Sequence, residues 1–198
     1  MESEAKDATF VVSVLTSLDG YYEGPGGDLS PMPFEHAFTT HNLELLRRAD
    51  TVVYGSTWFP SNFRHWSAIA EDPSSEQREL DTARLITTLD SLVISDSMTI
   101  GPGDPWAPTS SVVARSEAPA EIARRKANGE SLLMFGSATT WNPLLAAGVV
   151  DELIVLVGAA MLGAGSKMYA GERAGLRLLE ASVLPDSELV KLRYDARC

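Results

Sequence analysis

The sequence has little cysteine and no long hydrophobic run. Its one cysteine, Cys198, is the last of 198 residues, so it has no partner for an internal disulfide or a cysteine metal cluster. No apolar run reaches the roughly 18 residues that a membrane span needs, and the charged N-terminus does not resemble a signal peptide. We therefore expect a cytoplasmic protein without a membrane partner.

The sequence also has fewer basic residues than acidic ones. The chain has 16 lysines and arginines against 27 aspartates and glutamates, a formal net charge of -11. Such a surface repels the phosphates of nucleic acids, so the sequence predicts no nucleic-acid partner, although a small anion can still bind through backbone dipoles. With 44% hydrophobic residues, the chain is long enough for one domain with a substantial core.

Histidine is scarce, and the three residues present, His36, His41 and His65, form no metal-binding pattern. His36 and His41 are five residues apart and so do not share one helix face, unlike a His-x-x-x-His zinc pair. The sequence predicts no metal. It also lacks a nucleophile elbow, a P-loop and a complete dinucleotide fingerprint, because Met168 stands where the last glycine of that fingerprint belongs.

Strand and helix patterns alternate along most of the chain. We predict strands over residues 9–15, 51–54, 92–94, 111–114, 132–135 and 149–157, and a hairpin over 176–183 and 189–194. Helices are predicted over 34–48, over 75–88 behind a capping box of Ser74 and Gln77, and over 118–128. The segment 58–72 contains Pro60 and is predicted as irregular with one helical turn. This order predicts a mixed, largely parallel sheet with an antiparallel edge.

The continuous apolar run 132–135 predicts a central strand that is covered on both faces. Gly136 and small hydroxyl residues follow it. Asn142 and Pro143 then resemble a helix N-cap and first turn, which predicts a short helix over 143–147 with its positive end toward that loop. Such a loop can bind the phosphates of a nucleotide, but the same pattern also fits an ordinary strand-to-helix turn.

Several predicted strands end in glycine or small hydroxyl residues. Ligands of open α/β sheets bind at the carboxyl ends of the strands, so these ends can converge on one elongated ligand such as a dinucleotide. The segments are Gly55-Ser56-Thr57, Ser95-Asp96-Ser97, Gly136-Ser137-Ala138 and Gly163-Ala164-Gly165.

The order of these motifs resembles the dihydrofolate-reductase-like family, and best its branch containing the C-terminal reductase domain of bacterial riboflavin biosynthesis. The resemblance rests on Ser17-Leu18-Asp19-Gly20 and, most specifically, on the block from Phe135-Gly136-Ser137-Ala138 to Val150-Asp151-Glu152-Leu153. It implies one α/β domain over residues 9–195, with a mixed, mostly parallel sheet of about eight strands, flanking helices and an antiparallel C-terminal edge. It also implies a homodimer.

The resemblance further implies a reductase that transfers a hydride from NADPH, or NADH, to a C=N or C=O bond of a small, pterin- or pyrimidine-like substrate. Asp19 is the candidate catalytic residue, orienting the substrate or relaying a proton, although it is equally suited to a turn. The implied cofactor-binding residues are Gly55, Ser56, Thr57, Ser95, Asp96, Ser97, Arg115, Gly136, Ser137, Ala138, Thr139, Leu162 and Gly163. The candidate substrate-binding residues are Leu18, Gly20, Tyr21 and the aromatic Trp58.

The sequence departs from the family pattern where relatives carry arginine. Ser56 is neutral and Asp96 is acidic, and neither suits the 2′-phosphate of NADPH. We therefore expect a weakened NADPH preference unless Arg64, Arg115 or Lys167 compensates. A non-catalytic nucleotide- or flavin-binding module that has kept the fold is the alternative function.

Two further departures concern the substrate and the partner. Phe135 replaces an acidic residue of the riboflavin branch, and Thr57 falls one residue early, which argues against a role in riboflavin synthesis itself. Neither Glu35 nor Glu44 matches the acidic residue of the folate enzyme. The apolar residues of 153–160 fit either a helix of the same chain or a partner subunit.

Overall fold

The computed structural model describes residues 8–197, and the chain forms two compact units. The first unit contains the described residues up to Phe10 together with Leu46–Leu133. The second contains Val11–Leu45 and the described residues from Met134 onward. Within residues 8–197, none of the helices has the length and apolar content of a membrane span.

The strands confirm the predicted mixed, mostly parallel sheet of about eight strands. The order is β5-β4-β3-β6-β1-β7-β10-β9, and β2 and β8 form a separate pair. The strands are β1 (Phe10–Thr16), β2 (Tyr21–Glu23), β3 (Thr51–Gly55), β4 (Asp90–Ile94), β5 (Ser110–Val113), β6 (Leu132–Phe135), β7 (Glu152–Val157), β8 (Ser166–Lys167), β9 (Arg177–Val183) and β10 (Val190–Asp195). The helices are α1 (His36–Leu46), α2 (Phe59–Glu71), α3 (Gln77–Thr88), α4 (Ala118–Ala127) and α5 (Ala138–Ala146), with a 3₁₀ turn at Pro25–Gly27.

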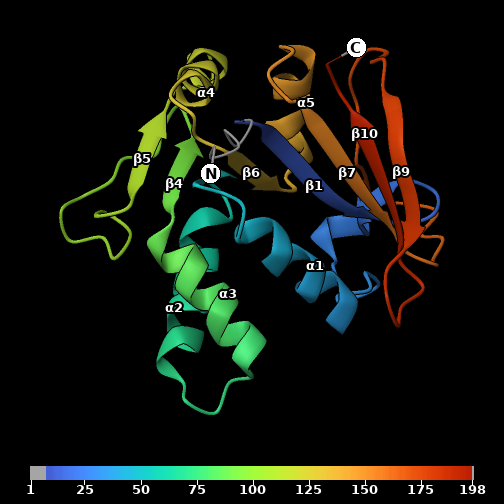
Figure 1. Cartoon of the computed structure of the whole chain (residues 1–198), viewed down its shortest axis with the longest axis horizontal. Coiled ribbons are helices and arrows are strands. Elements are labelled where there is room, and N and C mark those ends of the chain that lie inside the picture. The colour runs from blue at the N-terminus through green and yellow to red at the C-terminus, as the bar shows by residue number, and fades with distance from the viewer. Residues whose placement is uncertain (1–7, 198) are drawn as a thin grey trace, which may run out of the picture. The chain divides into compact units, whose positions relative to one another are not determined.

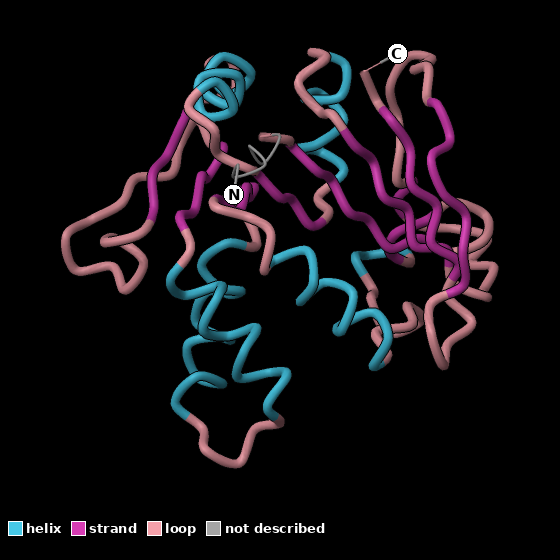
Figure 2. Tube along the Cα trace, viewed as in Figure 1, coloured by secondary structure: helices cyan, strands magenta, loops and turns pink. Residues whose placement is uncertain are grey.

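In the first unit, β3, β4 and β5 run parallel, with Gly55 opposite Ile94 and Ile94 opposite Val113. Helices α2 and α3 pack against each other and are joined by a short loop (Figures 1 and 2). An aromatic core made of Phe59, Phe63, Trp106 and the half-buried Tyr54 fills this unit together with aliphatic residues of β4 and β5. The ring contacts, with centroids 5.0–6.1 Å apart, fix the start of α2 beside the end of β3.

Two predictions for the helices of this unit are wrong. The segment 58–72 is a regular helix, because Pro60 lies in its first turn, where a backbone N–H has no partner within the helix. The buried Phe59 and Phe63 lie one turn apart and hold it to the core. The capping box of α3 pairs Glu76 with Glu79 rather than Ser74 with Gln77, so the helix begins two residues later than predicted.

In the second unit, β1 and β7 run parallel, and β7, β10 and β9 pair antiparallel, as predicted for the C-terminal edge. Helix α1 packs Phe38 and neighbouring apolar residues against a cluster that includes Ile154, Leu156 and Leu189. The apolar side chains of β7 are therefore buried within the chain itself. The sequence left open whether Leu153, Ile154 and Leu156 pack within the chain or against a partner subunit, and all three are buried within the chain.

The helix after the central strand begins earlier than predicted. It spans Ala138–Ala146, and Ser137, with a φ of 43°, occupies the position before its first residue. Pro143 lies inside the helix rather than in its first turn. Asn142 is not the cap, because its side chain amide donates to the Met168 carbonyl at 3.1 Å and accepts from the Ala170 N–H at 2.8 Å.

Candidate functional site

The strand ends of the first unit bring two predicted segments and the candidate residue Arg115 to one edge of β3, β4 and β5. Gly55 is the last residue of β3, Ser95 follows β4, and Arg115 lies two residues beyond β5. The Ser95 hydroxyl accepts hydrogen bonds from the Ser97 and Met98 amides at 3.3 and 3.0 Å, which fixes a tight turn after β4. Ser56 and Thr57 lie in the turn from β3 to α2, and Trp58, which precedes α2, is 58% exposed.

Asp96 and Arg115 form a pair in this edge. The Arg115 backbone N–H donates to Asp96 Oδ1 at 2.9 Å, and its guanidinium Nε lies 3.4 Å from Asp96 Oδ2. Both side chains are more than half exposed, so water screens their attraction. The Arg115 guanidinium, which the sequence analysis named as a candidate ligand for the 2′-phosphate, is nevertheless paired with the acidic Asp96.

The other two candidate cations also have partners. The Arg64 guanidinium lies over the Trp106 ring, 5.1 Å from its centroid. The Lys167 ammonium donates to the Asp19 carbonyl at 2.8 Å and lies 3.7 Å from the centre of the Tyr21 ring. Binding of a 2′-phosphate by any of these three cations would thus compete with contacts that already exist.

In the second unit, the loop from β6 to α5 has the backbone of an anion site. Gly136 and Ser137 both have positive φ values, 60° and 43°, and the Gly136 N–H donates to Ser13 on β1 at 3.1 Å. The amides of Thr140 and Trp141 bond to the Ser137 carbonyl, whereas the first amides of an α-helix have no partner within it. The Ser137 and Thr139 hydroxyls are 3.1 Å apart at the same helix end. Residues 136–139 can therefore bind a phosphate.

Asp19 links two segments that are 143 residues apart. Its carboxylate accepts hydrogen bonds from the Leu162 N–H at 3.1 Å and the Gly163 N–H at 2.7 Å, and from the Ser17 hydroxyl at 2.6 Å. The Ser17 hydroxyl and these two amides lower the pKa of Asp19 to about 2. Asp19 is thus ionised at neutral pH, which suits it to holding the 162–163 backbone and not to donating a proton.

Further contacts extend this link into a structure that we call the clasp, residues 17–24 and 160–168. The Leu18 N–H donates to the Ala160 carbonyl at 2.8 Å, and the Met168 N–H donates to the Gly20 carbonyl at 3.0 Å. Strands β2 and β8 pair antiparallel within the clasp. These short strands were not predicted, since the sequence shows only a glycine-rich loop there.

Gly165 is where the two segments of the clasp lie closest. Its φ is 128°, and a Cβ at this position would lie 2.0 Å from the Glu23 carbonyl oxygen and 2.9 Å from the Gly24 Cα. The neighbouring Ser166 hydroxyl donates to Glu23 at 2.6 Å. Only glycine allows this approach of the two backbones.

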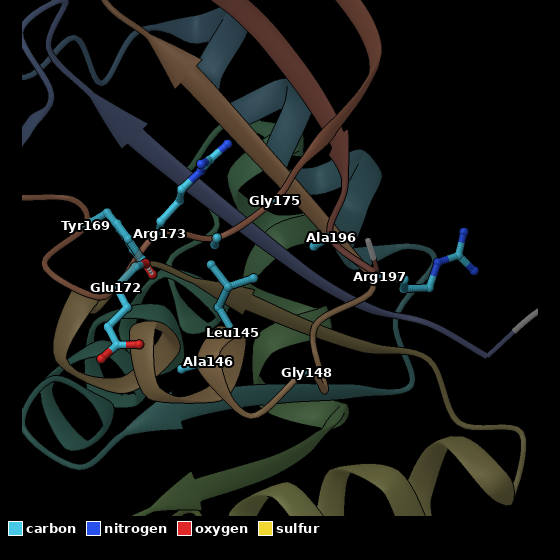
Figure 3. A pocket seen from close by; sticks show the side chains of 10 residues that line it. Leu145, Ala146, Gly148, Tyr169, Glu172, Arg173, Gly175, Ala196 and Arg197 are labelled. Carbon is cyan, nitrogen blue, oxygen red and sulfur yellow. Dashed lines mark hydrogen bonds between the residues drawn. The ribbon is translucent and has the colours of Figure 1, made fainter.

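A cavity of about 410 Å³ lies beside the end of α5 and the loop 169–175 (Figure 3). Its lining residues are Leu145, Ala146, Gly148, Tyr169, Glu172, Arg173, Ala174, Gly175, Ala196 and Arg197. None of the predicted site residues lines it. The side chains of Arg173 and Arg197 lie far apart in Figure 3, so they do not converge on one anion.

Two residues of the site were missed or misassigned by sequence reasoning. Asn142 joins α5 to the backbone after β8, and Ser17 orients Asp19. The spacing Ser17-x-Asp19 before a glycine is a signal for a side-chain-stabilised turn, but nothing in the local sequence indicates a contact of Asn142 with Met168. Among residues 8–197, no group of three or more His, Cys, Asp or Glu side chains is placed to hold a metal ion.

A model of the RibD C-terminal domain family matches residues 8–192 of the chain. Among curated proteins, no sequence matches. Among solved structures, a protein from Shewanella sp. PV-4 named for riboflavin biosynthesis is 21% identical, with a TM-score of 0.67 over 94% of this chain and 98% of that one.

Two other structures extend the comparison to reductases. A diaminohydroxyphosphoribosylaminopyrimidine deaminase/5-amino-6-(5-phosphoribosylamino)uracil reductase from Thermotoga maritima is 12% identical, with a TM-score of 0.63 over 96% of this chain and 57% of that one. Dihydrofolate reductase from Enterococcus faecalis, complexed with NADP(H), is 11% identical, with a TM-score of 0.57 over 96% of each chain. At these identities the structures show the fold, which confirms the predicted dihydrofolate-reductase-like architecture.

Proposed function

The chain belongs to the RibD C-terminal domain family, and on that premise we propose that it is a reductase that transfers a hydride from NADPH or NADH to a C=N or C=O bond of a small substrate. Two structures with this fold support the reaction class. One is named as a uracil-derivative reductase, and the other is a reductase complexed with NADP(H).

The observation that carries the proposal is a chain of hydrogen bonds within the second unit. Asn142 on α5 donates to the Met168 carbonyl, the Met168 N–H donates to the Gly20 carbonyl, and the neighbouring Asp19 holds the Gly163 amide. The phosphate-suited loop at the start of α5 and the clasp are thus held in a fixed relation to each other. A hydride transfer needs this kind of rigid placement of cofactor and substrate.

Each group of residues then has a proposed role. The bound nicotinamide supplies the hydride. Residues 136–139 hold the pyrophosphate, Leu162 and Gly163 border the nicotinamide, and Leu18, Gly20 and Tyr21 border the substrate. Asp19 acts by fixing the 162–163 backbone, and since its carboxylate is ionised, a water molecule supplies the proton that completes the reduction.

The residues proposed for the adenosine half lie in the first unit. They are Gly55, Ser56, Thr57, Ser95, Asp96, Ser97 and Arg115. Because Asp96 is acidic and pairs with Arg115, we expect NADH to bind at least as well as NADPH. Trp58, largely exposed before α2, is kept as a proposed contact for a flat ring.

Titration of the purified protein with NADPH, NADH and a flavin, followed by quenching of tryptophan fluorescence, tests the proposal. Saturable nicotinamide binding, followed by substrate-dependent oxidation with a panel of pterins, ketones and imines, is the expected result. Nicotinamide binding without turnover would favour the non-catalytic module. If the protein binds only the flavin, or binds none of the three nucleotides, the reductase proposal is wrong.

A variant tests the proposed phosphate loop directly. Thr139→Glu places a carboxylate at the start of α5, where it favours the helix but repels a pyrophosphate. We expect nicotinamide affinity to fall at least about tenfold at an unchanged unfolding temperature. Thr88→Glu, at the exposed end of α3, adds the same charge and should leave the affinity unchanged.

A homodimer is also proposed. Strand β9 is the last in the strand order, and its Leu178, Leu179 and Val183 are 54%, 40% and 61% exposed. A strand edge with exposed apolar side chains favours pairing with a second copy. Light scattering should give a dimer for the natural chain and a monomer for Leu178→Lys.

A further inference from the structure

Two of the most exposed large apolar residues belong to the two segments that form the clasp. Leu18 is 66% exposed and Met161 is 71% exposed. Their backbone segments are joined, because the Leu18 N–H donates to the carbonyl of Ala160, the residue before Met161, at 2.8 Å. We call Leu18, Ala160 and Met161 the apolar rim. Asp19 fixes its position through the Leu162 and Gly163 amides, so the rim borders the backbone assigned to the nicotinamide.

The charges around the apolar rim are mostly negative. The described residues 17–28 and 158–168 carry the carboxylates of Asp19, Glu23 and Asp28 and one cation, Lys167. A cavity of about 140 Å³ beside Ala160 is lined by two more carboxylates, Glu35 and Glu188. No arginine lies in these segments to bind a phosphate through a bidentate pair.

The single cation of these segments is already engaged. The Lys167 ammonium donates to the Asp19 carbonyl and lies over the Tyr21 ring. Recruiting it for a ligand phosphate would release both contacts and bring the phosphate toward the ionised Asp19. An anionic substrate is therefore disfavoured at the rim, whereas an apolar group gains from covering Leu18 and Met161.

We propose, resting on the reductase function above, that the substrate is an uncharged small molecule whose apolar part contacts Leu18 and Met161, and that phosphorylated substrates are excluded. The Thermotoga maritima reductase, by contrast, is named for a phosphoribosyl compound. The two chains would then share the fold and the hydride transfer but differ in the charge of the substrate.

Matched pairs of probes test this proposal. The neutral members are 4-acetylbenzyl alcohol, 5-hydroxy-2-pentanone and 6-hydroxymethylpterin, and each is compared with its phosphate monoester. Binding is measured by calorimetry, with and without saturating oxidised nicotinamide. We expect at least one neutral probe to bind about tenfold or more tightly than its ester, with the gap narrowing at high salt. An ester that binds as tightly as its neutral counterpart, or no binding of any neutral probe at millimolar concentration, would overturn the proposal.

Charge-adding variants separate the local effect from the overall charge. Met161→Lys should raise the affinity for the phosphate esters about tenfold or more, because it places an unpaired cation at the rim. Ala147→Lys adds the same charge at the exposed end of α5 and should change neither the affinity for the phosphate esters nor that for the neutral probes. If both variants bind the phosphate esters with the same affinity, the charge near the rim does not select the substrate.

The two proposals fail in different ways. If the protein binds no nicotinamide or shows no turnover, the reductase proposal is wrong. The affinities of the nucleotide-free protein for the neutral and phosphorylated probes still test the proposal for the apolar rim. Nicotinamide binding together with preferred binding of phosphate esters leaves the reductase in place and removes the neutral-substrate proposal.

Discussion

Replacing Gly165 by alanine should open the clasp. A Cβ at residue 165 would lie 2.0 Å from the Glu23 carbonyl oxygen and 2.9 Å from the Gly24 Cα, far inside van der Waals contact. Both obstacles are backbone atoms, which cannot turn aside as a side chain can. The strands β2 and β8 must therefore separate, which weakens the 2.6 Å hydrogen bond from Ser166 to Glu23.

The expected loss of stability has two parts. Holding alanine at a φ of 128° costs about 1–3 kcal/mol. Each weakened hydrogen bond of the clasp adds about 0.5–1.5 kcal/mol. The sum is about 3 kcal/mol, which lowers the unfolding temperature of a chain of this length by about 6–12 °C.

Gly163→Ala is the matched control. Gly163 also has a positive φ, 71°, but apart from its two chain neighbours no residue has a heavy atom within 4 Å of its added Cβ. Its substitution should cost only about 1–2 kcal/mol, from the backbone conformation alone. Thermal unfolding of both variants, followed by circular dichroism, makes the comparison. Equal unfolding temperatures would refute the reasoning from the close approach of the two backbones.

Three further predictions concern individual side chains. Because the pKa of Asp19 is lowered to about 2 from 3.8, its carboxylate stabilises the fold above pH 4 and this contribution is lost as the pH falls toward 2. Urea midpoints of the natural chain and Asp19→Asn should thus differ at pH 6 and converge near pH 2. Asp96→Ala releases Arg115 and should tighten NADPH about tenfold while leaving NADH within about twofold, as measured by fluorescence titration. Asn142→Asp turns a donor toward the Met168 carbonyl into an acceptor, and should lower stability by about 1–3 kcal/mol and raise the KM of both cofactor and substrate in steady-state kinetics.

The strands were predictable because a strand buried on both faces appears in the sequence as a continuous apolar run. Val53, Val93 and Met134 belong to continuous apolar runs that no helix pattern explains, and all three are buried. The alternation of these runs with helix patterns gave the mixed sheet and its antiparallel edge. The family resemblance, confirmed by the match over residues 8–192, rests on the same local blocks.

Two of the helix errors, at α2 and α5, have a shared cause in proline. Pro60 suggested an irregular segment, yet in the first turn of α2 its missing N–H is harmless. Asn142-Pro143 suggested a helix start, yet the helix begins at Ala138 and Asn142 uses its side chain on a distant backbone. In both places the position of proline within the helix, which depends on tertiary packing, decided the outcome.

The candidate site was predictable only where it is local. Glycine and hydroxyl residues at the ends of β3, β4 and β6 follow directly from the order of residues along the chain. The clasp does not, because Asp19 meets Leu162 and Gly163 across 143 and 144 residues. The pairing of Asp96 with Arg115, one of the three cations that the sequence offered for a 2′-phosphate, was likewise not predictable from the local sequence.

The separation of the two halves of the clasp along the chain has a consequence for folding. Joining segments 143 residues apart carries a loop-closure free energy of about 4 kcal/mol on the (3/2)RT ln n scaling, before any stabilising contact forms. During synthesis, Asp19 leaves the ribosome long before the backbone that it will hold exists. The clasp therefore forms late, after both of its segments have been synthesised, and a chain cut before residue 160 would have no means of building it.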